Sequence, residues 1–260
     1  MTEDYVTAYE LYQGDCLELM KNIPDKSIDM IFCDLPFGKT QCSWDKPLDL
    51  TALWGGYSRV IKDNGAIVLF GQEPFSSEVR LSNLKDYKYD WIWRKPKGTG
   101  HLNAKRQPMR DYENIMVFYK KQCTYNPQYE KGEPYAPKSR KVSKINVAGE
   151  TTYGKFVDGN EVRNPNSGFR YPKQVIEFGV VERGTLHQTQ KPVPLLEYLI
   201  KTYTNEGNLV LDNCMGSGST GVAALNLNRR FIGMELDEKY FTIAKERIDN
   251  RIKELNDNVS

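Results

Sequence analysis

The 260-residue sequence lacks the patterns that mark several classes of protein. Its five cysteines lie far apart and include no Cys-x-x-Cys pair, which argues against a disulfide framework and against a zinc site. No stretch reaches the roughly 18 apolar residues of a membrane span. The N-terminus has neither the basic nor the apolar region of a signal peptide. We therefore expect a protein without a metal site that works in the cytoplasm, away from membranes.

Charge of one sign is also scarce overall, because the formal net charge is only +2. The charges are nevertheless uneven. Residues 91–144 hold 13 Lys and Arg against 4 Asp and Glu, together with five tyrosines and several prolines and glycines. A basic, aromatic, loop-rich region on a slightly acidic body is typical of a face that binds a polyanion, and a solvated insertion is the alternative interpretation.

Short apolar runs alternate with amphipathic stretches, and this pattern predicts an α/β fold. The predicted strands are 10–12, 29–33, 66–70, 90–93, 114–119, 174–178, 208–211 and 231–234. The predicted helices are 16–22, 51–61, 76–83, 194–203, 219–227 and 238–254. Between residues 120 and 173 the periodicity fades and turn signals take over. We interpret that stretch as a separate lobe inserted between two parts of one sheet.

The junction at Asp34-Leu35-Pro36-Phe37 is the most informative point in the chain. It follows the apolar run 28–33, and Pro36 ends the predicted strand because proline cannot continue a ladder. Ligands of open α/β sheets bind beyond the carboxyl ends of the strands. A carboxylate, rigidly held carbonyls and an aromatic ring at that edge suit a planar ligand that carries an amino group.

A second signal is the strand 209–212, followed by a glycine-rich turn and a predicted helix. Gly216-x-Gly218-x-x-Gly221 matches the dinucleotide fingerprint, and Glu235 lies 19 residues beyond Gly216, at the end of the next predicted strand. The glycines let the backbone approach a ligand closely, and the acid suits the hydroxyls of a ribose, so this segment predicts a cofactor that contains a nucleoside. Asp212 can pair with an ammonium group and would repel a pyrophosphate, and only 39 residues follow Gly221. Both observations favour S-adenosylmethionine over NAD.

These segments resemble the motifs of DNA amino-methyltransferases. Asp34-Leu35-Pro36-Phe37 is similar to their Asp-Pro-Pro-Tyr catalytic motif, and residues 212–218 are similar to their cofactor loop. Residues 14–16 and 187–192 resemble two further motifs of the family, and the order matches its circularly permuted beta class. The resemblance implies a Rossmann-like, seven-stranded class I S-adenosylmethionine methyltransferase sheet with an inserted target-recognition lobe.

The same resemblance divides the chain and assigns roles to its residues. The catalytic half is expected at 1–98, the target-recognition lobe at 99–182 and the cofactor-binding half at 183–260. The implied catalytic residues are Asp34, Leu35, Pro36 and Phe37. The implied cofactor-binding residues are Asp15, Cys16, Asp34, Thr189, Lys191, Asp212, Gly216, Ser217, Gly218 and Glu235. Asp15 would contact the adenine, Glu235 the ribose, and Thr189 and Lys191 the methionyl carboxylate. Asp15 is also placed to cap the helix that follows it.

The predicted function is sequence-specific methyl transfer to the N6 amino group of adenine in double-stranded DNA, with the target base flipped out. A homodimer and a cognate restriction endonuclease are candidate partners, and a bacterial or phage-infected cell is the expected setting. Methyl transfer to the N4 amino group of cytosine is the main alternative function. An inactive DNA-binding homologue and an NAD-dependent oxidoreductase are less favoured by the sequence. Cytosine carbon-5 chemistry needs a thiolate, and the sequence contains no Pro-Cys dipeptide. Leu35 and Phe37 depart from the family motif, since a proline and the tyrosine hydroxyl are missing.

Overall fold

The structure, a computed structural model, describes residues 9–38, 47–133, 168–181 and 190–257. The chain forms two compact units. The larger unit comprises the described residues up to Asn126 and from Lys173 onward, and the smaller unit lies within 127–172. Among the described residues, no helix is both long and apolar enough to cross a membrane.

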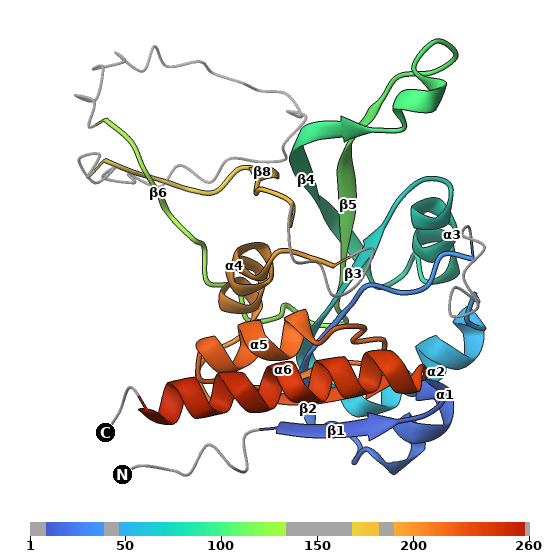
Figure 1. Cartoon of the computed structure of the whole chain (residues 1–260), viewed down its shortest axis with the longest axis vertical. Helices are drawn as coiled ribbons and strands as arrows, with labels where there is room; N and C mark the ends of the chain where they lie inside the picture. Colours follow the sequence, from blue (N-terminus) through green and yellow to red (C-terminus); the bar gives the residue numbers. More distant parts are fainter. Residues whose placement is uncertain (1–8, 39–46, 134–167, 182–189, 258–260) are drawn as a thin grey trace, which may run out of the picture. The chain divides into compact units, whose positions relative to one another are not determined.

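The larger unit is built on one eight-stranded sheet (Figure 1). In spatial order its strands are β1 (Tyr9–Gln13), β10 (Arg230–Glu235), β9 (Leu209–Asp212), β2 (Ile28–Cys33), β3 (Ile61–Gly71), β5 (Arg110–Phe118), β4 (Tyr87–Thr99) and β8 (Val175–Glu177). From β1 to β3 every neighbouring pair is parallel, whereas β5 runs antiparallel to both β3 and β4. The carboxyl ends of the parallel strands therefore meet at one edge of the sheet, together with the amino end of β5.

Helices cover both faces of this sheet. They are α1 (Cys16–Leu19), α2 (Leu50–Val60), α3 (Phe75–Ser82), α4 (Val193–Tyr203), α5 (Ser219–Asn226) and α6 (Glu238–Asp257), with short 3₁₀ turns at Met20–Asn22 and His101–Asn103. Met30 and Phe32 of β2 pack in the cluster that contains α4, α5 and α6. Ile31 and Cys33 pack in the cluster that contains α1, α2 and α3. A strand covered on both faces needs a continuous apolar run, and this requirement explains the sequence of β2.

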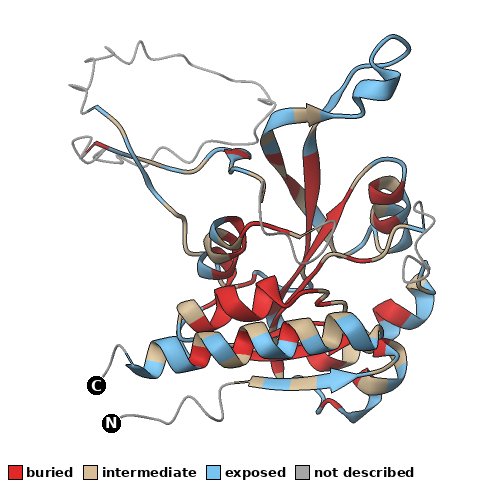
Figure 2. Ribbon diagram, in the orientation of Figure 1, coloured by how far each residue is buried: buried red, intermediate tan, exposed pale blue. Residues whose placement is uncertain are grey.

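The sheet buries its centre and leaves one hairpin in solvent (Figure 2). β4 and β5 pair through Trp93 with Glu113 and Arg94 with Tyr112, and they meet again at Thr99 with Arg110 after an irregularity. Beyond that last pair the chain turns through the 3₁₀ segment His101–Asn103. Residues 99–110 are all exposed.

Every predicted strand and helix is present, with ends that differ by a few residues in most cases. The largest differences are at β3 and β4, which extend well beyond the apolar cores 66–70 and 90–93 that predicted them. The predicted seven-stranded core corresponds to the strands from β1 to β4 in spatial order. The three-residue β8 adds an eighth strand beside β4.

The smaller unit contains a short antiparallel pair, β6 (Glu130–Lys131) with β7 (Phe169–Arg170). Tyr129 packs against Phe169 and Tyr171, with ring centroids 6.5 Å and 5.1 Å apart. This unit falls inside the stretch 120–173 where the sequence loses its periodicity. The proposed division at 1–98, 99–182 and 183–260 remains a prediction.

Candidate active site

One cavity of about 630 Å³ lies where the carboxyl ends of β1, β2, β9 and β10 meet. Each of these strand ends contributes an acid to its lining. Asp15 follows β1, Asp34 follows β2, Asp212 ends β9 and Glu235 ends β10. The parallel sheet thus brings together four carboxylates that are far apart in the sequence, as expected for a ligand site at this edge.

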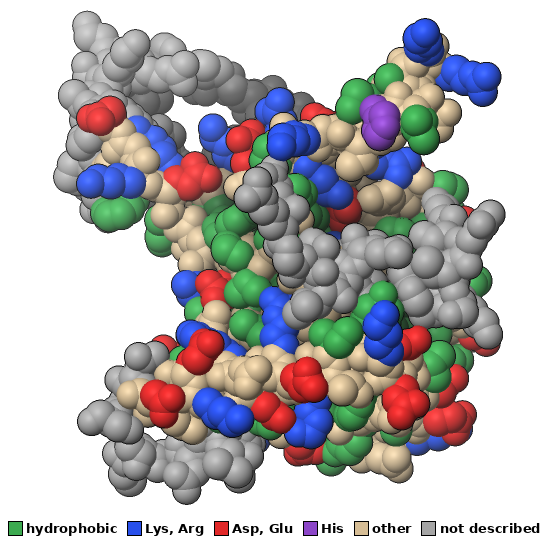
Figure 3. All heavy atoms as spheres, viewed as in Figure 1, with side chains coloured by type: hydrophobic (Ala, Val, Ile, Leu, Met, Phe, Trp, Pro, Cys, Tyr) green, Lys and Arg blue, Asp and Glu red, His purple; other side chains and the backbone are tan. Residues whose placement is uncertain are grey.

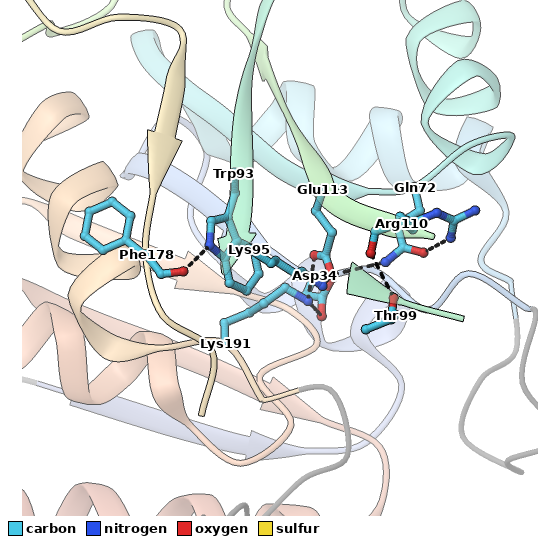
Figure 4. Close-up of polar contacts among 9 residues, drawn as sticks. All are labelled: Asp34, Gln72, Trp93, Lys95, Thr99, Arg110, Glu113, Phe178 and Lys191. Carbon is cyan, nitrogen blue, oxygen red and sulfur yellow. Dashed lines mark hydrogen bonds and ion pairs between the residues drawn. The ribbon is translucent and has the colours of Figure 1, made fainter. Parts of the chain in front are cut away.

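Asp34 is the centre of the cavity's charged wall (Figure 4). Its Oδ2 accepts a hydrogen bond from the Lys191 ammonium at 2.5 Å, whereas its Oδ1 is buried and has no hydrogen-bond partner among the described residues. Burial raises the pKa of Asp34, Lys191 opposes this rise, and the neighbouring Glu113 carboxylate adds to it. An unpartnered buried carboxylate oxygen costs free energy unless a donor reaches it. Asp34 therefore has one oxygen ready to accept an N–H group from a ligand.

The rest of the 34–37 motif is ordered around this carboxylate. The Leu35 side chain is only 3% exposed and packs in the core beneath the cavity. The Phe37 ring lies 4.8 Å from the ring of Phe75, at the start of α3. Pro36 and Phe37 both line the cavity. A leucine in place of the family's proline is accommodated by apolar packing, and its carbonyl is retained.

Glu113 is a site residue that sequence reasoning missed. It is 5% exposed, accepts hydrogen bonds from Lys95 and from Gln72 Nε2 (3.1 Å), and its Oε2 lies 3.4 Å from the Lys191 ammonium. Burial raises the pKa of Glu113, but Lys191 and Lys95 outweigh burial and bring that pKa below its usual value. The available signal was a pair of polar residues at the start of an apolar strand. In an antiparallel strand it is the amino end that reaches this edge of the sheet.

The glycine turn after β9 is held by the acid that ends β10. Glu235 Oε2 accepts from the Gly216 amide at 2.8 Å, and its Oε1 accepts from the Asp237 amide at 2.9 Å. Gly216 and Gly218 adopt positive φ values of 51° and 76°, a conformation that favours glycine. Burial raises the pKa of Glu235.

Two charged side chains stand around that turn. Asp212 is 3% exposed, accepts from the Cys214 amide at 3.1 Å, and burial raises its pKa to about 7. From α6, Arg247 Nη1 donates to the Ser219 hydroxyl at 2.8 Å and to the Ser217 carbonyl at 3.1 Å. Arg247 could not be singled out from the sequence, because it lies on a helix whose contacts only the fold determines.

Asp15 and Cys16 also line the cavity. Asp15 caps α1 by accepting from the Leu17 amide at 2.8 Å, which is its structural role, and its contact with adenine stays a prediction. Contact with the Cys214 thiol, together with burial, raises the pKa of Cys16. A thiol in this state is a poor nucleophile, which agrees with the expectation of chemistry without a thiolate.

The structure brings most of the predicted site residues into this one cavity. Its lining includes Asp15, Cys16, Asp34, Leu35, Pro36, Phe37, Lys191, Asp212, Gly216, Ser217 and Glu235. Gly218 is not among the lining residues and is the N-cap residue of α5, where an added Cβ would lie 3.0 Å from Ala244 Cβ. Thr189 lies outside the described residues. No cluster of metal-binding side chains occurs in the part of the chain that the structure describes.

A family model described as DNA methylase matches residues 28–246. The chain belongs to this family. Among its relatives are the type II methyltransferase M.HpaI of Haemophilus parainfluenzae and the DNA adenine methyltransferase YhdJ of Escherichia coli K12. M.HpaI is 29% identical, over 91% of this chain and 73% of its own length. YhdJ is 27% identical, over 93% of this chain and 83% of its own length. The predicted family is therefore confirmed.

Solved structures of DNA methylases share the fold. The complex of M1.HpyAVI with SAM is 26% identical, with a TM-score of 0.62 over 92% of this chain and 99% of the other. The cytosine-N4-specific PvuII DNA methyltransferase has a TM-score of 0.63 over 95% of this chain and 92% of its own, but it is only 16% identical and shows the fold alone. The predicted class I methyltransferase fold is confirmed.

Proposed function

We propose that this DNA methylase transfers a methyl group from S-adenosylmethionine to the exocyclic N6 amino group of adenine in DNA. The observation that carries the proposal is the buried, unpartnered Oδ1 of Asp34, a residue that lines the same cavity as the glycine turn of the cofactor motif. The name of the relative YhdJ, a DNA adenine methyltransferase, supports adenine as the base.

The residues around the glycine turn fit S-adenosylmethionine. Asp212 is a buried acid without a cationic partner among the described residues, and an ammonium group would stabilise its ionised form. Gly216 and Ser217 allow the backbone to approach the methionine part. We assign the ribose hydroxyls to Glu235, whose oxygens each retain acceptor capacity, and the adenine to Asp15 beside Cys16. Thr189 and Lys191 are assigned to the methionyl carboxylate.

The protein must make the exocyclic amino group of the base more reactive towards the methyl group. An aromatic amine is a poor nucleophile, because its lone pair is delocalised into the ring. Asp34 and the Leu35 carbonyl would accept its two N–H bonds, favour a pyramidal nitrogen and stabilise the positive charge that develops on it. Phe37 would stack on the base, and Pro36 keeps this segment rigid. S-adenosylmethionine supplies the electrophilic methyl group for direct transfer.

A paired base in a duplex cannot reach this cavity, so the substrate base must flip out, at a cost of a few kcal/mol. We assign part of the compensation to stacking on Phe37. Double-stranded DNA is thus the proposed macromolecular substrate, and a cytoplasmic site of action in a bacterial or phage-infected cell follows from it. A second copy of the chain and a cognate restriction endonuclease remain proposed partners.

The test compares Asp34→Ala with a matched control, Asp63→Ala. Asp63 is a surface acid paired with Lys26 and Lys121. Asp34→Ala should bind S-adenosylmethionine in calorimetry yet lose tritium transfer to DNA by at least about 10²–10³-fold, because it removes the main charge facing the reacting nitrogen. Asp63→Ala should match the wild type in both assays.

Mass spectrometry of digested DNA then distinguishes N6-methyladenine from N4-methylcytosine, which is the alternative product. Modification-sensitive sequencing of DNA from expressing cells gives the recognition sequence. Retained turnover in Asp34→Ala would rule out the catalytic role of Asp34. If N4-methylcytosine were found instead of N6-methyladenine, the same mechanism would act on cytosine.

A further inference from the structure

The β4–β5 hairpin ends in an arm, residues 97–110, that stands away from the rest of the larger unit (Figures 1 and 2). Every residue from Thr99 to Arg110 is exposed. The arm is nevertheless ordered at its base, where Thr99 pairs with Arg110 after an irregularity and Thr99 Oγ1 donates to the Arg110 carbonyl at 3.2 Å, and a 3₁₀ turn follows at His101–Asn103. A protein gains no stability from such a projection on its own, so contact with a ligand is the better explanation for it.

The charge of the arm has one sign. From Arg94 to Arg110 the chain carries six Lys and Arg and no Asp or Glu. Lys and Arg side chains gather at its end in Figure 3. Lys105 and Arg106, at the tip, make no side-chain hydrogen bond or ion pair with any residue that the structure describes. Unpaired cations on a projecting element are typical of contacts with phosphate.

The base of the arm is connected to the catalytic cavity. Lys95 and Thr99 line the cavity on β4, and Glu113 lines it on β5. Arg110 donates to Gln72, which in turn donates to Glu113 at 3.1 Å (Figure 4). Leu102 is three residues beyond Thr99, which corresponds to roughly 10 Å of extended chain. Whatever the tip binds therefore lies immediately outside the cavity that holds Asp34.

The tip also exposes apolar surface. Leu102 is 88% exposed and Met109 is 44% exposed. A large apolar side chain between cations is unfavourable in water, but it suits apolar contact with bases, such as the thymine methyl group in the major groove.

We propose that the 97–110 arm enters the major groove of the substrate duplex, with Lys105 and Arg106 on phosphates and Leu102 against the bases beside the extruded one. The arm is a hairpin that pairs at Thr99 and Arg110 and contains a 3₁₀ turn, and the major groove of B-DNA, about 12 Å wide, admits a two-stranded hairpin element. This inference rests on the proposed function for the identity of the substrate. It assigns this contact to a defined element of the larger unit that falls mostly within the range 99–182 expected for the target-recognition lobe.

The deciding experiment measures binding and needs no turnover. The full chain is titrated by fluorescence anisotropy against a labelled mixed-sequence DNA duplex of about 30 base pairs, and log Kd is plotted against log KCl concentration. Each lost phosphate contact lowers the slope by about 0.9, so the double variant Lys105→Ala/Arg106→Ala should lose about 1.8 from it. The matched control Lys21→Ala/Lys245→Ala removes two exposed lysines, one in the 3₁₀ turn Met20–Asn22 and one on α6, and should leave the slope unchanged. An equal slope for wild type and arm variant overturns the proposal.

Leu102→Ala tests the apolar contact, with Leu81→Ala as control because Leu81 is also 73% exposed but lies on α3. Leu102→Ala should keep the salt slope and lower the rate of methylation of duplex DNA by about tenfold, whereas Leu81→Ala should match the wild type. A wild-type rate for Leu102→Ala overturns the role of this residue.

The anisotropy titration is repeated with a single-stranded RNA of equal length, which is the alternative ligand. If the arm variant changed the salt slope only with RNA, duplex DNA would be rejected as the ligand of the arm. If the wild type failed to transfer methyl groups, the proposed function would be contradicted. The binding titration would still test the contact between the arm and DNA, because it needs no turnover.

Discussion

At the scale of single residues, the active-site charges form a balanced set. Asp34 and Glu113 carry two negative charges, and Lys95 and Lys191 carry two positive ones (Figure 4). Lys191 is 2.5 Å from Asp34 and 3.4 Å from Glu113, so its ammonium has a second acceptor ready. If it stayed on Asp34, this ammonium would repel the charge that develops on the substrate nitrogen. We therefore expect Glu113 to hold Lys191 while Asp34 serves the substrate.

Glu113→Gln should lower kcat by about 10- to 100-fold, because a neutral amide leaves Lys191 on Asp34. The pH profile gives a sharper signature. Asp34 faces Lys191, Lys95 from β4, Glu113 from β5 and Asp212 from β9, and the Glu113 charge raises its pKa. Loss of that charge should move the acid limb of kcat/KM to lower pH, even though the enzyme is slower.

The control is Glu73→Gln, which removes a surface partner of Arg80 outside the cavity. It should leave both kcat and the pH profile unchanged. If Glu113 only supported the fold, its variant would have a lower melting temperature, but the remaining folded enzyme would show the wild-type acid limb.

Residues at the carboxyl ends of parallel strands were predictable from the sequence. Asp34, Asp212 and Glu235 each end an apolar run, and strands of one direction place such ends together. Glu113 and Arg247 were not predictable in this way. Glu113 reaches the cavity only because β5 reverses direction, and Arg247 reaches the turn only through the packing of α6 on α5. Neither relation is local in the chain.

At the scale of elements, the unit β9–turn–α5 buries an acid whose charge depends on pH. In the free protein, burial raises the pKa of Asp212 to about 7. An ammonium group beside it would lower that pKa, so binding should release a proton near neutral pH. Affinity for S-adenosylmethionine should therefore fall as pH falls through the pKa, with Kd rising roughly five- to tenfold from about pH 7.5 to about pH 6.

Calorimetry in buffers of different ionisation enthalpy measures the released proton directly. Asp212→Asn is the control: its affinity should be weaker and nearly independent of pH across this window. A wild-type affinity that is the same at both pH values would contradict the assignment of Asp212 to the ammonium group.

The packing of β10 against the glycine turn leaves no room for a side chain at Gly233. A Cβ there would lie 2.3 Å from Met215 Sδ and 2.7 Å from Phe231 Cε1. Gly233→Ala should cost about 1–3 kcal/mol of unfolding free energy from overpacking, and should weaken cofactor binding because Met215 belongs to the turn.

In α2, Gly55 has no atom within 4 Å of its Cβ position. Gly55→Ala should instead stabilise the protein by about 0.5–1 kcal/mol, measured by urea unfolding. Equal effects of the two changes would contradict this account.

Elements were easier to predict than their lengths. The apolar periodicity located all strands of the sheet, but it underestimated β4, because the outer half of that strand is polar and exposed. The sequence 94–110 reads as a basic loop, whereas pairing with β5 makes it an ordered arm. Cross-strand hydrogen bonds determine such a structure, and they leave no hydrophobic pattern.

At the scale of the whole molecule, the larger unit places two distant parts of the chain on either side of one cavity. The segment that ends in Asp34 precedes the segment that ends in Asp212 by more than half of the chain, yet β2 and β9 are hydrogen-bonded neighbours. The resemblance to a circularly permuted family predicted this arrangement. Without it, the sequence alone leaves the order of the strands open, because β2 could pair with several other apolar runs.

Residues 127–172 form the smaller unit and hold 8 Lys and Arg against 5 Asp and Glu. Both ends of this segment are attached near one place in the larger unit. Asn126 bonds to the Thr202 carbonyl through its amide at 2.7 Å, and Gln174 bonds to the Asp90 carbonyl at 2.7 Å. Tyr203 and Trp91, the next residues, are themselves joined at 2.6 Å.

Replacing residues 127–172 with roughly 12 Gly and Ser residues, which span about 40 Å when extended, should therefore keep the sheet intact. We expect the Kd for S-adenosylmethionine to stay within about twofold of wild type in calorimetry, since the cavity lies wholly in the larger unit. Methylation of duplex DNA at the native recognition sequence, followed by modification-sensitive sequencing, should be lost, because the segment lies in the predicted target-recognition lobe. Methylation that persists at the same sequence would place recognition in the larger unit, where the 97–110 arm is the remaining candidate.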